Sequence, residues 1–166
     1  MEVTTQCDGT RGRTAGFFLP LYGTTHCIYN SRKKSHTMFE FHRNERARQL
    51  RPSLSRSWLL VRANSSEEVF EEAFESEADS IIIDLEDGCP AEEKDAAREQ
   101  VVRMLNSGVV AWVRINAITT EHWWKDVKAL KNVKGLRGVM LATAEHATDI
   151  DRTAAELPPG TPIIAL

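Results

Sequence analysis

Residues 78–98, ADSIIIDLEDGCPAEEKDAAR, decide the fold of this chain. Their first part, SIIIDL at residues 80–85, is a short apolar run rich in β-branched side chains, which is typical of a strand buried on both faces. The acidic turn that follows leads to Pro90, a residue that suits a first helical turn because no N–H partner is needed there. A buried strand, a polar turn and a helix in this order predict one β/α unit.

The same unit repeats on both sides of this stretch. Apolar runs that predict strands start at residues 58, 80, 109, 136 and 162, which are 22 to 29 residues apart. Between them, apolar residues at helical spacing predict helices that begin near Ser65 or Ser66, near Pro90 and near Thr120, and a last one around Ile150. Regular alternation of this kind indicates parallel strands joined by crossover helices.

Two α/β architectures have this alternation. One is a (β/α)8 TIM barrel, of which the chain holds about strands 1–5, and the other is an open, doubly wound sheet. A doubly wound dinucleotide-binding fold carries a glycine-rich loop after its first strand, but Arg62, Ala63 and Asn64 stand there. We therefore expect a partial TIM barrel, in which active-site residues lie at the carboxyl ends of the strands.

Charge divides the chain into two parts. Residues 1–56 carry ten Lys/Arg and four Asp/Glu, a balance of +6, whereas residues 57–166 carry eleven and twenty, a balance of −9. No helix or strand period runs through the first part, so we interpret residues 1–56 as a basic, largely disordered extension and residues 57–166 as the barrel domain. Nucleic-acid binding by the basic arm is not favoured, because no stacking aromatics accompany its arginines. Met38 is a second candidate for the start of translation.

Composition excludes some classes of protein. The chain has 166 residues, of which 42% are hydrophobic and 27% charged, and no run of about 20 apolar residues, so we expect no membrane-spanning segment. Its 3 cysteines are too few and too scattered for a disulfide framework or a zinc site. This favours a reducing compartment, and we expect the cytoplasm, with mitochondrial targeting as the alternative.

Charged residues end two neighbouring predicted strands. Glu86 and Asp87 follow the strand at 80–85, and Arg114 closes the strand at 109–115. Because the carboxyl ends of parallel strands meet at one rim, these side chains are expected to converge. Carboxylates there hold a divalent cation and its waters, while an arginine binds a substrate carboxylate in two-pronged fashion. The alternatives are a solvated acidic turn and a structural salt bridge from Arg114 to Glu86 or Asp87.

Five passages together resemble the HpcH/HpaI aldolase and citrate lyase β-subunit family. They are RSWLLVRAN (56–64), residues 78–98 as quoted above, VRINAI (113–118), GVMLATAE (138–145) and LPPGTPIIAL (157–166). The resemblance implies a TIM-barrel carbon–carbon lyase that uses Mg²⁺ and acts on an acyl-CoA, such as citryl-CoA or malyl-CoA, or on a hydroxy or keto acid. It also implies that Arg114 binds the substrate and that Glu86 and Asp87 lie behind the metal and its waters. The complete protein is expected to be a homo-oligomer.

The chain also departs from the family pattern. Arg62 stands where the family usually has Pro, residues 65–66 are Ser-Ser in place of an Arg-Pro pair, and residues 142–143 are Ala-Thr in place of Pro-Lys. The resemblance implies that the direct Mg²⁺ ligands lie beyond Leu166, so no metal ligand is assigned in this chain. We expect an N-terminal fragment of the barrel that is inactive alone. The alternative is a truncated, non-catalytic paralogue that serves as a binding or assembly partner.

Overall fold

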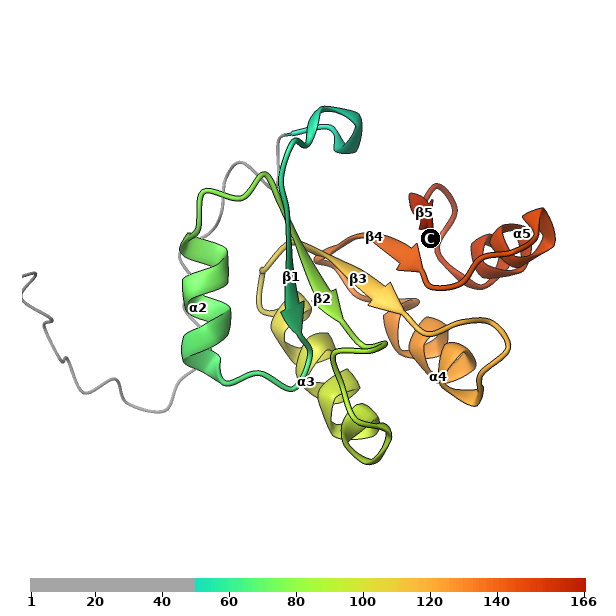
Figure 1. Cartoon of the computed structure of the whole chain (residues 1–166), viewed down its shortest axis with the longest axis horizontal. Helices are drawn as coiled ribbons and strands as arrows, with labels where there is room; N and C mark the ends of the chain where they lie inside the picture. The colour runs from blue at the N-terminus through green and yellow to red at the C-terminus, as the bar shows by residue number, and fades with distance from the viewer. Residues whose placement is uncertain (1–49) are drawn as a thin grey trace, which may run out of the picture. The chain divides into compact units, whose positions relative to one another are not determined.

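The structure, a computed structural model, describes residues 50–166, which contain a five-stranded parallel sheet (Figure 1). Its strands are β1 (Trp58–Arg62), β2 (Ser80–Asp84), β3 (Ala111–Ile115), β4 (Leu136–Leu141) and β5 (Ile163–Ala165). Their order in the sheet is β1-β2-β3-β4-β5, the same as their order in the chain. A doubly wound sheet reverses its strand order at a switch point, whereas a barrel does not. The sequential order therefore confirms the partial TIM barrel.

The helices lie between the strands where the apolar spacing predicts them. After β1 the chain enters α2 next to Ser66, and the predicted helix at Pro90 begins as one 3-10 turn, η2, before α3. Thr120 caps α4, because its hydroxyl accepts the Trp123 N–H at 3.4 Å. The elements are η1 (Pro52–Leu54), α2 (Glu67–Glu75), η2 (Ala91–Glu93), α3 (Lys94–Asn106), α4 (Glu121–Leu130) and α5 (Ala147–Glu156).

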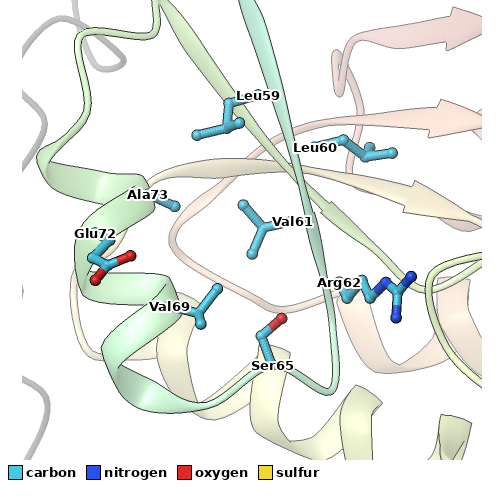
Figure 2. A pocket seen from close by; sticks show the side chains of 8 residues that line it. All are labelled: Leu59, Leu60, Val61, Arg62, Ser65, Val69, Glu72 and Ala73. Carbon is cyan, nitrogen blue, oxygen red and sulfur yellow. The ribbon is translucent and has the colours of Figure 1, made fainter.

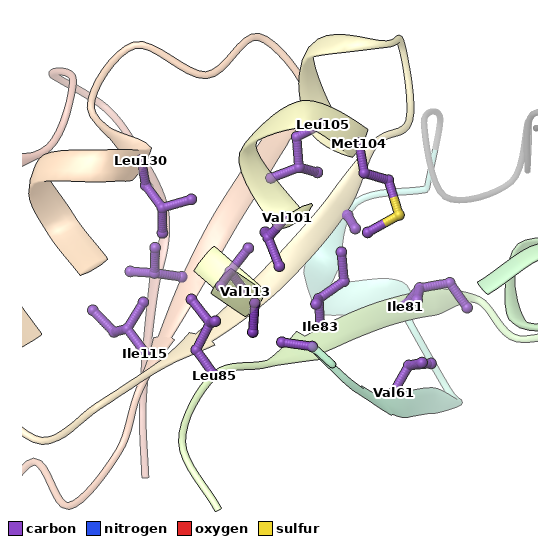
Figure 3. Close-up of a cluster of buried hydrophobic side chains, with 14 of the residues drawn as sticks. Val61, Ile81, Ile83, Leu85, Val101, Met104, Leu105, Val113, Ile115 and Leu130 are labelled. Carbon is purple, nitrogen blue, oxygen red and sulfur yellow. The ribbon is translucent and has the colours of Figure 1, made fainter. Parts of the chain in front are cut away.

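One face of the sheet packs against the helices and forms the hydrophobic core (Figure 3). Side chains alternate along a strand, so Ile81, Ile83 and Leu85 of the β2 region share this face and are fully buried. Met104 and Leu105 of α3 belong to the same cluster. Ile82, which points to the other face, is buried but lies outside this cluster. The central strand β2 is therefore buried on both faces, as expected for a strand inside a parallel sheet.

The opposite face carries two tryptophans. The rings of Trp58 and Trp112 meet edge to face with their centroids 5.4 Å apart. Trp112 also lies across Gly138 of β4, where an added Cβ would collide with the indole ring. Glycine at this position leaves room for the large ring beside β4. This face is the inner face of the barrel, because the helices occupy the other one.

The predicted extension, residues 1–56, lies outside the described residues except for its last seven. Residues 50–56 contain η1 and end beside the amino end of β2. There the backbone N–H and the Nε of Arg56 donate to Asp79 Oδ2 at 2.9 and 3.2 Å. The hydroxyls of Ser55 and Ser80 lie 2.8 Å apart. Among residues 50–166, no helix has both the length and the apolar character that a bilayer crossing requires.

Candidate functional site

A two-pronged ion pair joins the carboxyl ends of β2 and β3. Asp84 and Arg114 are register partners on these strands. The Nε of Arg114 donates to Asp84 Oδ1 at 2.7 Å, and Nη2 donates to Asp84 Oδ2 at 2.6 Å. The Asp84 side chain is 2% exposed and that of Arg114 is 16% exposed. Such a fork fixes the plane of the guanidinium and leaves its remaining N–H groups at the rim.

The loop after β2 folds back on Asp84. The backbone N–H of Glu86 donates to Asp84 Oδ1 at 3.0 Å, and that of Gly88 donates to Oδ2 at 2.8 Å. A Cβ on Gly88 would run into the Asp84 carboxylate, so glycine allows this close approach. Together with the two bonds from Arg114, Asp84 accepts four hydrogen bonds. A carboxylate offers about four acceptor positions, so those of Asp84 are all taken.

Glu86 and Asp87 differ in how they meet Arg114. Glu86 is half-buried, and its Oε2 lies 3.3 Å from Arg114 Nη1. Asp87 is exposed and acts on Arg114 through its charge. The hydrogen bonds with Asp84 raise the pKa of Arg114 above its ordinary value, and the charges of Asp84, Glu86 and Asp87 add to the effect. The structure thus brings Glu86 and Arg114 together, but it pairs Arg114 first with Asp84, which sequence reasoning did not single out.

A buried lysine holds the loop after β2 through its backbone carbonyls. Lys94, the first residue of α3, is 7% exposed. Its Nζ donates to the carbonyls of Leu85 and Glu86 at 2.6 and 2.7 Å and to Asn116 Oδ1 at 2.7 Å. All three ammonium protons are therefore used. Sequence reasoning missed Lys94, although its position on the stripe that continues to Ala97 was a signal of burial.

Asn116 connects the lysine to a second buried charge pair. Its backbone N–H and Nδ2 donate to Asp126 Oδ2 at 3.0 and 2.6 Å. Asp126 is fully buried on α4, and its Oδ1 accepts from Arg98 Nε at 2.8 Å. Buried charges are costly unless they are paired and hydrogen-bonded, and Arg98, Asp126, Asn116 and Lys94 are joined in this way, although Nη2 of Arg98 is buried without a hydrogen-bond partner. The cluster fastens α3 and α4 to the rim that carries Arg114.

The described residues do not provide a complete metal-coordination set. Residues 50–166 contain no group of three or more His, Cys, Asp or Glu side chains placed to hold a metal ion. The oxygens of Asp84 are already taken by four donors. Glu86 and Asp87 remain as the carboxylates of this loop at the rim. Two carboxylates, one of which already pairs with Arg114, do not make up the oxygen ligand set of a divalent cation.

A pocket of about 410 Å³ lies between β1 and α2 (Figure 2). Leu59 and Val61 face α2 in this pocket, whereas Leu60 and Arg62 point to the other side of β1 (Figure 2). Its apolar wall includes Val69 of α2. The pocket thus lies along β1 and α2, and neither Asp84 nor Arg114 lines it.

Comparisons with known proteins converge on one family. The family model for HpcH/HpaI aldolase/citrate lyase matches residues 56–162. No curated protein sequence matches the chain. A solved structure of the citrate lyase β subunit from M. tuberculosis, complexed with oxaloacetate and magnesium, is 31% identical with a TM-score of 0.52, over 65% of this chain and 45% of that one.

Two further structures are similar. CitE from Mycobacterium tuberculosis in complex with magnesium, acetoacetate and coenzyme A is 30% identical with a TM-score of 0.55, over 68% of this chain and 39% of that one. RipC from Yersinia pestis is 25% identical with a TM-score of 0.52, over 68% of this chain and 46% of that one. The chain spans less than half the length of each of these three structures.

Proposed function

The chain belongs to the HpcH/HpaI aldolase/citrate lyase family, and on that premise we propose that the complete protein is a Mg²⁺-dependent carbon–carbon lyase. Its substrate is a 3-hydroxyacyl-CoA such as citryl-CoA or malyl-CoA. The observation that carries this proposal is the guanidinium of Arg114, held in a fixed plane at the carboxyl end of β3 by Asp84. Residues at this end of barrel strands perform the chemistry in TIM-barrel enzymes.

The reaction places negative charge where such a cation is useful. Cleavage breaks the bond between C2 and C3, and its electron pair moves to the thioester carbonyl as an enolate. The C3 hydroxyl loses its proton to a base and becomes the carbonyl of the second product, and the enolate takes up a proton at C2 to give the acyl-CoA product. A fixed, always charged arginine stabilises carboxylate or enolate oxygens as charge develops, because no reorganisation is needed at that moment. In this proposal Arg114 binds those substrate oxygens.

The proposed dependence on Mg²⁺ is supported by the relatives, whose structures contain magnesium together with oxaloacetate or acetoacetate. When bound, Mg²⁺ supplies additional stabilisation of the enolate oxygen. Glu86 and Asp87 would contact water molecules around the ion, and its direct ligands would come from outside residues 50–166. Because residues 50–166 hold no full set of ligands, the 166-residue chain alone is expected to show no turnover.

The test measures cleavage of citryl-CoA and malyl-CoA by the complete protein, with Mg²⁺ and with EDTA. We expect Mg²⁺-dependent turnover, and a loss of about 100-fold or more in kcat/KM for Arg114→Ala. The control is Arg103→Ala, since Arg103 is exposed on α3 and pairs only loosely with Glu99 at 3.7 Å. Unchanged kcat/KM in Arg114→Ala contradicts the role of Arg114. Absence of cleavage of either thioester contradicts the proposed reaction.

A further inference from the structure

A second arginine lies on the same inner row as Arg114. The register pairs Arg62 of β1 with Asp84 of β2, and Asp84 with Arg114 of β3. Residues paired in register on neighbouring parallel strands point to the same face of the sheet. Arg62 therefore belongs to the inner face at the carboxyl rim, and Figure 2 shows its side chain on the side of β1 that faces away from α2. This row therefore consists of a cation on β1, an anion on β2 and a cation on β3.

Asp84 is the natural cross-strand partner for Arg62, yet it makes no ion pair with it. The reason is that its four acceptor positions are filled by Arg114 and by two backbone N–H groups. Glu93, another nearby carboxylate, accepts from Asn64 Nδ2 at 2.6 Å. Arg62 is exposed, and within residues 50–166 its guanidinium has no hydrogen-bond or ion-pair partner. Among residues 50–166, one of the two cations in the row is thus neutralised, whereas the other has no counter-ion.

We propose that Arg62 binds a second free carboxylate of the substrate, so that the site prefers acyl or keto-acid groups with two free carboxylates, such as citryl-CoA and oxaloacetate, over those with one, such as malyl-CoA and acetoacetate. This inference rests on the proposed function and deepens it by naming the substrate class. Neighbouring strands are about 4.8 Å apart, so the Cα atoms of Arg62 and Arg114 are about 10 Å apart. Arginine side chains are long enough to span this distance, so both guanidinium groups can contact a short dicarboxylate on the inner face. Arginine suits the role because its fork matches a carboxylate.

A phosphate group of coenzyme A is also an anion that arginine binds, but it lies farther from the reacting carbons than a carboxylate of the acyl group does. Arg62 shares its row with Arg114, which contacts the reacting part of the substrate in the proposed function. A carboxylate of the acyl group is close to the reacting carbons, whereas the phosphates of coenzyme A are on the far side of the thioester. The experiment therefore includes coenzyme A alone as a separate ligand.

The experiment measures binding to the complete protein by calorimetry, without any need for turnover. The ligands are oxaloacetate and acetoacetate, which differ by one carboxylate, and coenzyme A. Arg62→Gln is expected to weaken oxaloacetate binding by about 10- to 100-fold, the usual effect of losing a charged hydrogen-bonded pair, and to leave the Kd of acetoacetate within about twofold. The matched control, Arg103→Gln, is expected to bind all three ligands like the wild type.

Four results overturn the inference. They are equal weakening of oxaloacetate and acetoacetate, no weakening of either, a loss confined to coenzyme A, and a wild type that does not bind oxaloacetate more tightly than acetoacetate. Circular dichroism of Arg62→Gln verifies that the fold is intact, as expected for an exposed side chain. If the complete protein cleaves no acyl-CoA but still shows selectivity dependent on Arg62, the proposed reaction fails and this inference stands.

Discussion

Asp84→Asn is the substitution that most directly tests how the rim is held together. It keeps the size of the side chain but removes the charge that faces Arg114, and it replaces one acceptor oxygen by a donor NH₂ group. In the structure both oxygens of Asp84 accept two hydrogen bonds each. Asparagine has only one acceptor oxygen, so two of the four donors lose their partner.

The expected loss of stability follows from the number of donors that lose their partner. A buried donor without a partner costs about 1–3 kcal/mol, so two such donors cost about 2–6 kcal/mol. Removing one partner of a buried ion pair typically costs about 3–5 kcal/mol, which agrees with this range. Since Asp84 is 2% exposed and Arg114 16% exposed, solvent does little to compensate. We expect the free energy of unfolding to fall by about 3–5 kcal/mol, a large share of the stability of a typical domain.

The assay is urea unfolding of the 166-residue chain, followed by circular dichroism, in a double-mutant cycle. The cycle combines Asp84→Asn with Arg114→Met and is expected to give a coupling energy of about 1–3 kcal/mol. The matched control is a cycle of Glu99→Gln with Arg103→Met. This exposed pair on α3, with side chains 77% and 61% exposed, is expected to couple by about 0.5 kcal/mol or less.

Two results refute the reasoning. The first is a loss of less than about 1 kcal/mol for Asp84→Asn, which would mean that its hydrogen bonds exchange freely with water. The second is additive behaviour of Asp84→Asn and Arg114→Met, which would mean that the two side chains do not depend on each other.

Three further predictions concern other parts of the domain. A hydrogen bond from Arg98 lowers the pKa of Asp95 below its ordinary value of 3.8. Asp95 therefore contributes stability above that pH, and this contribution is lost as the pH falls through its folded pKa. Asp95→Asn should reduce the fall in the free energy of unfolding at acid pH, as measured by unfolding curves at a series of pH values. Burial raises the pKa of the Cys89 thiol, so iodoacetamide should label Cys89 slowly in the folded chain and rapidly in urea, as followed by peptide mass spectrometry. Gly138→Ala should destabilise the chain by about 1–3 kcal/mol in urea unfolding, because its Cβ collides with the Trp112 ring.

Much of the fold is readable along the chain because its signals are local. Apolar runs and turn residues place all five strands, although the third begins at Ala111 rather than 109 and the last covers only Ile163–Ala165. The position of Arg114 at a strand end also follows from its place after an apolar run. These features depend on neighbours a few residues away, and periodicity reports them directly.

Which side chains pair with each other at the site is not readable from the local sequence. Asp84 and Arg114 are 30 residues apart, and Lys94 and Asn116 are 22 apart. Nothing in the local pattern says that Asp84, the first carboxylate of a short acidic run, forms the two-pronged pair with Arg114 while Glu86 makes a longer contact. That choice depends on the register of β2 with β3 and on the loop that folds back through Gly88.

The sequence by itself determined the alternation of strands and helices, the family, and the rim on which charged residues gather. Only the tertiary structure decided that the strands follow one another in order, that Asp84 is saturated, and that Arg62 is left without a partner among residues 50–166. The physical reason is that hydrogen-bond capacity is finite. Which of several candidate donors fills the positions of a carboxylate depends on which backbone and side-chain groups the fold brings within reach.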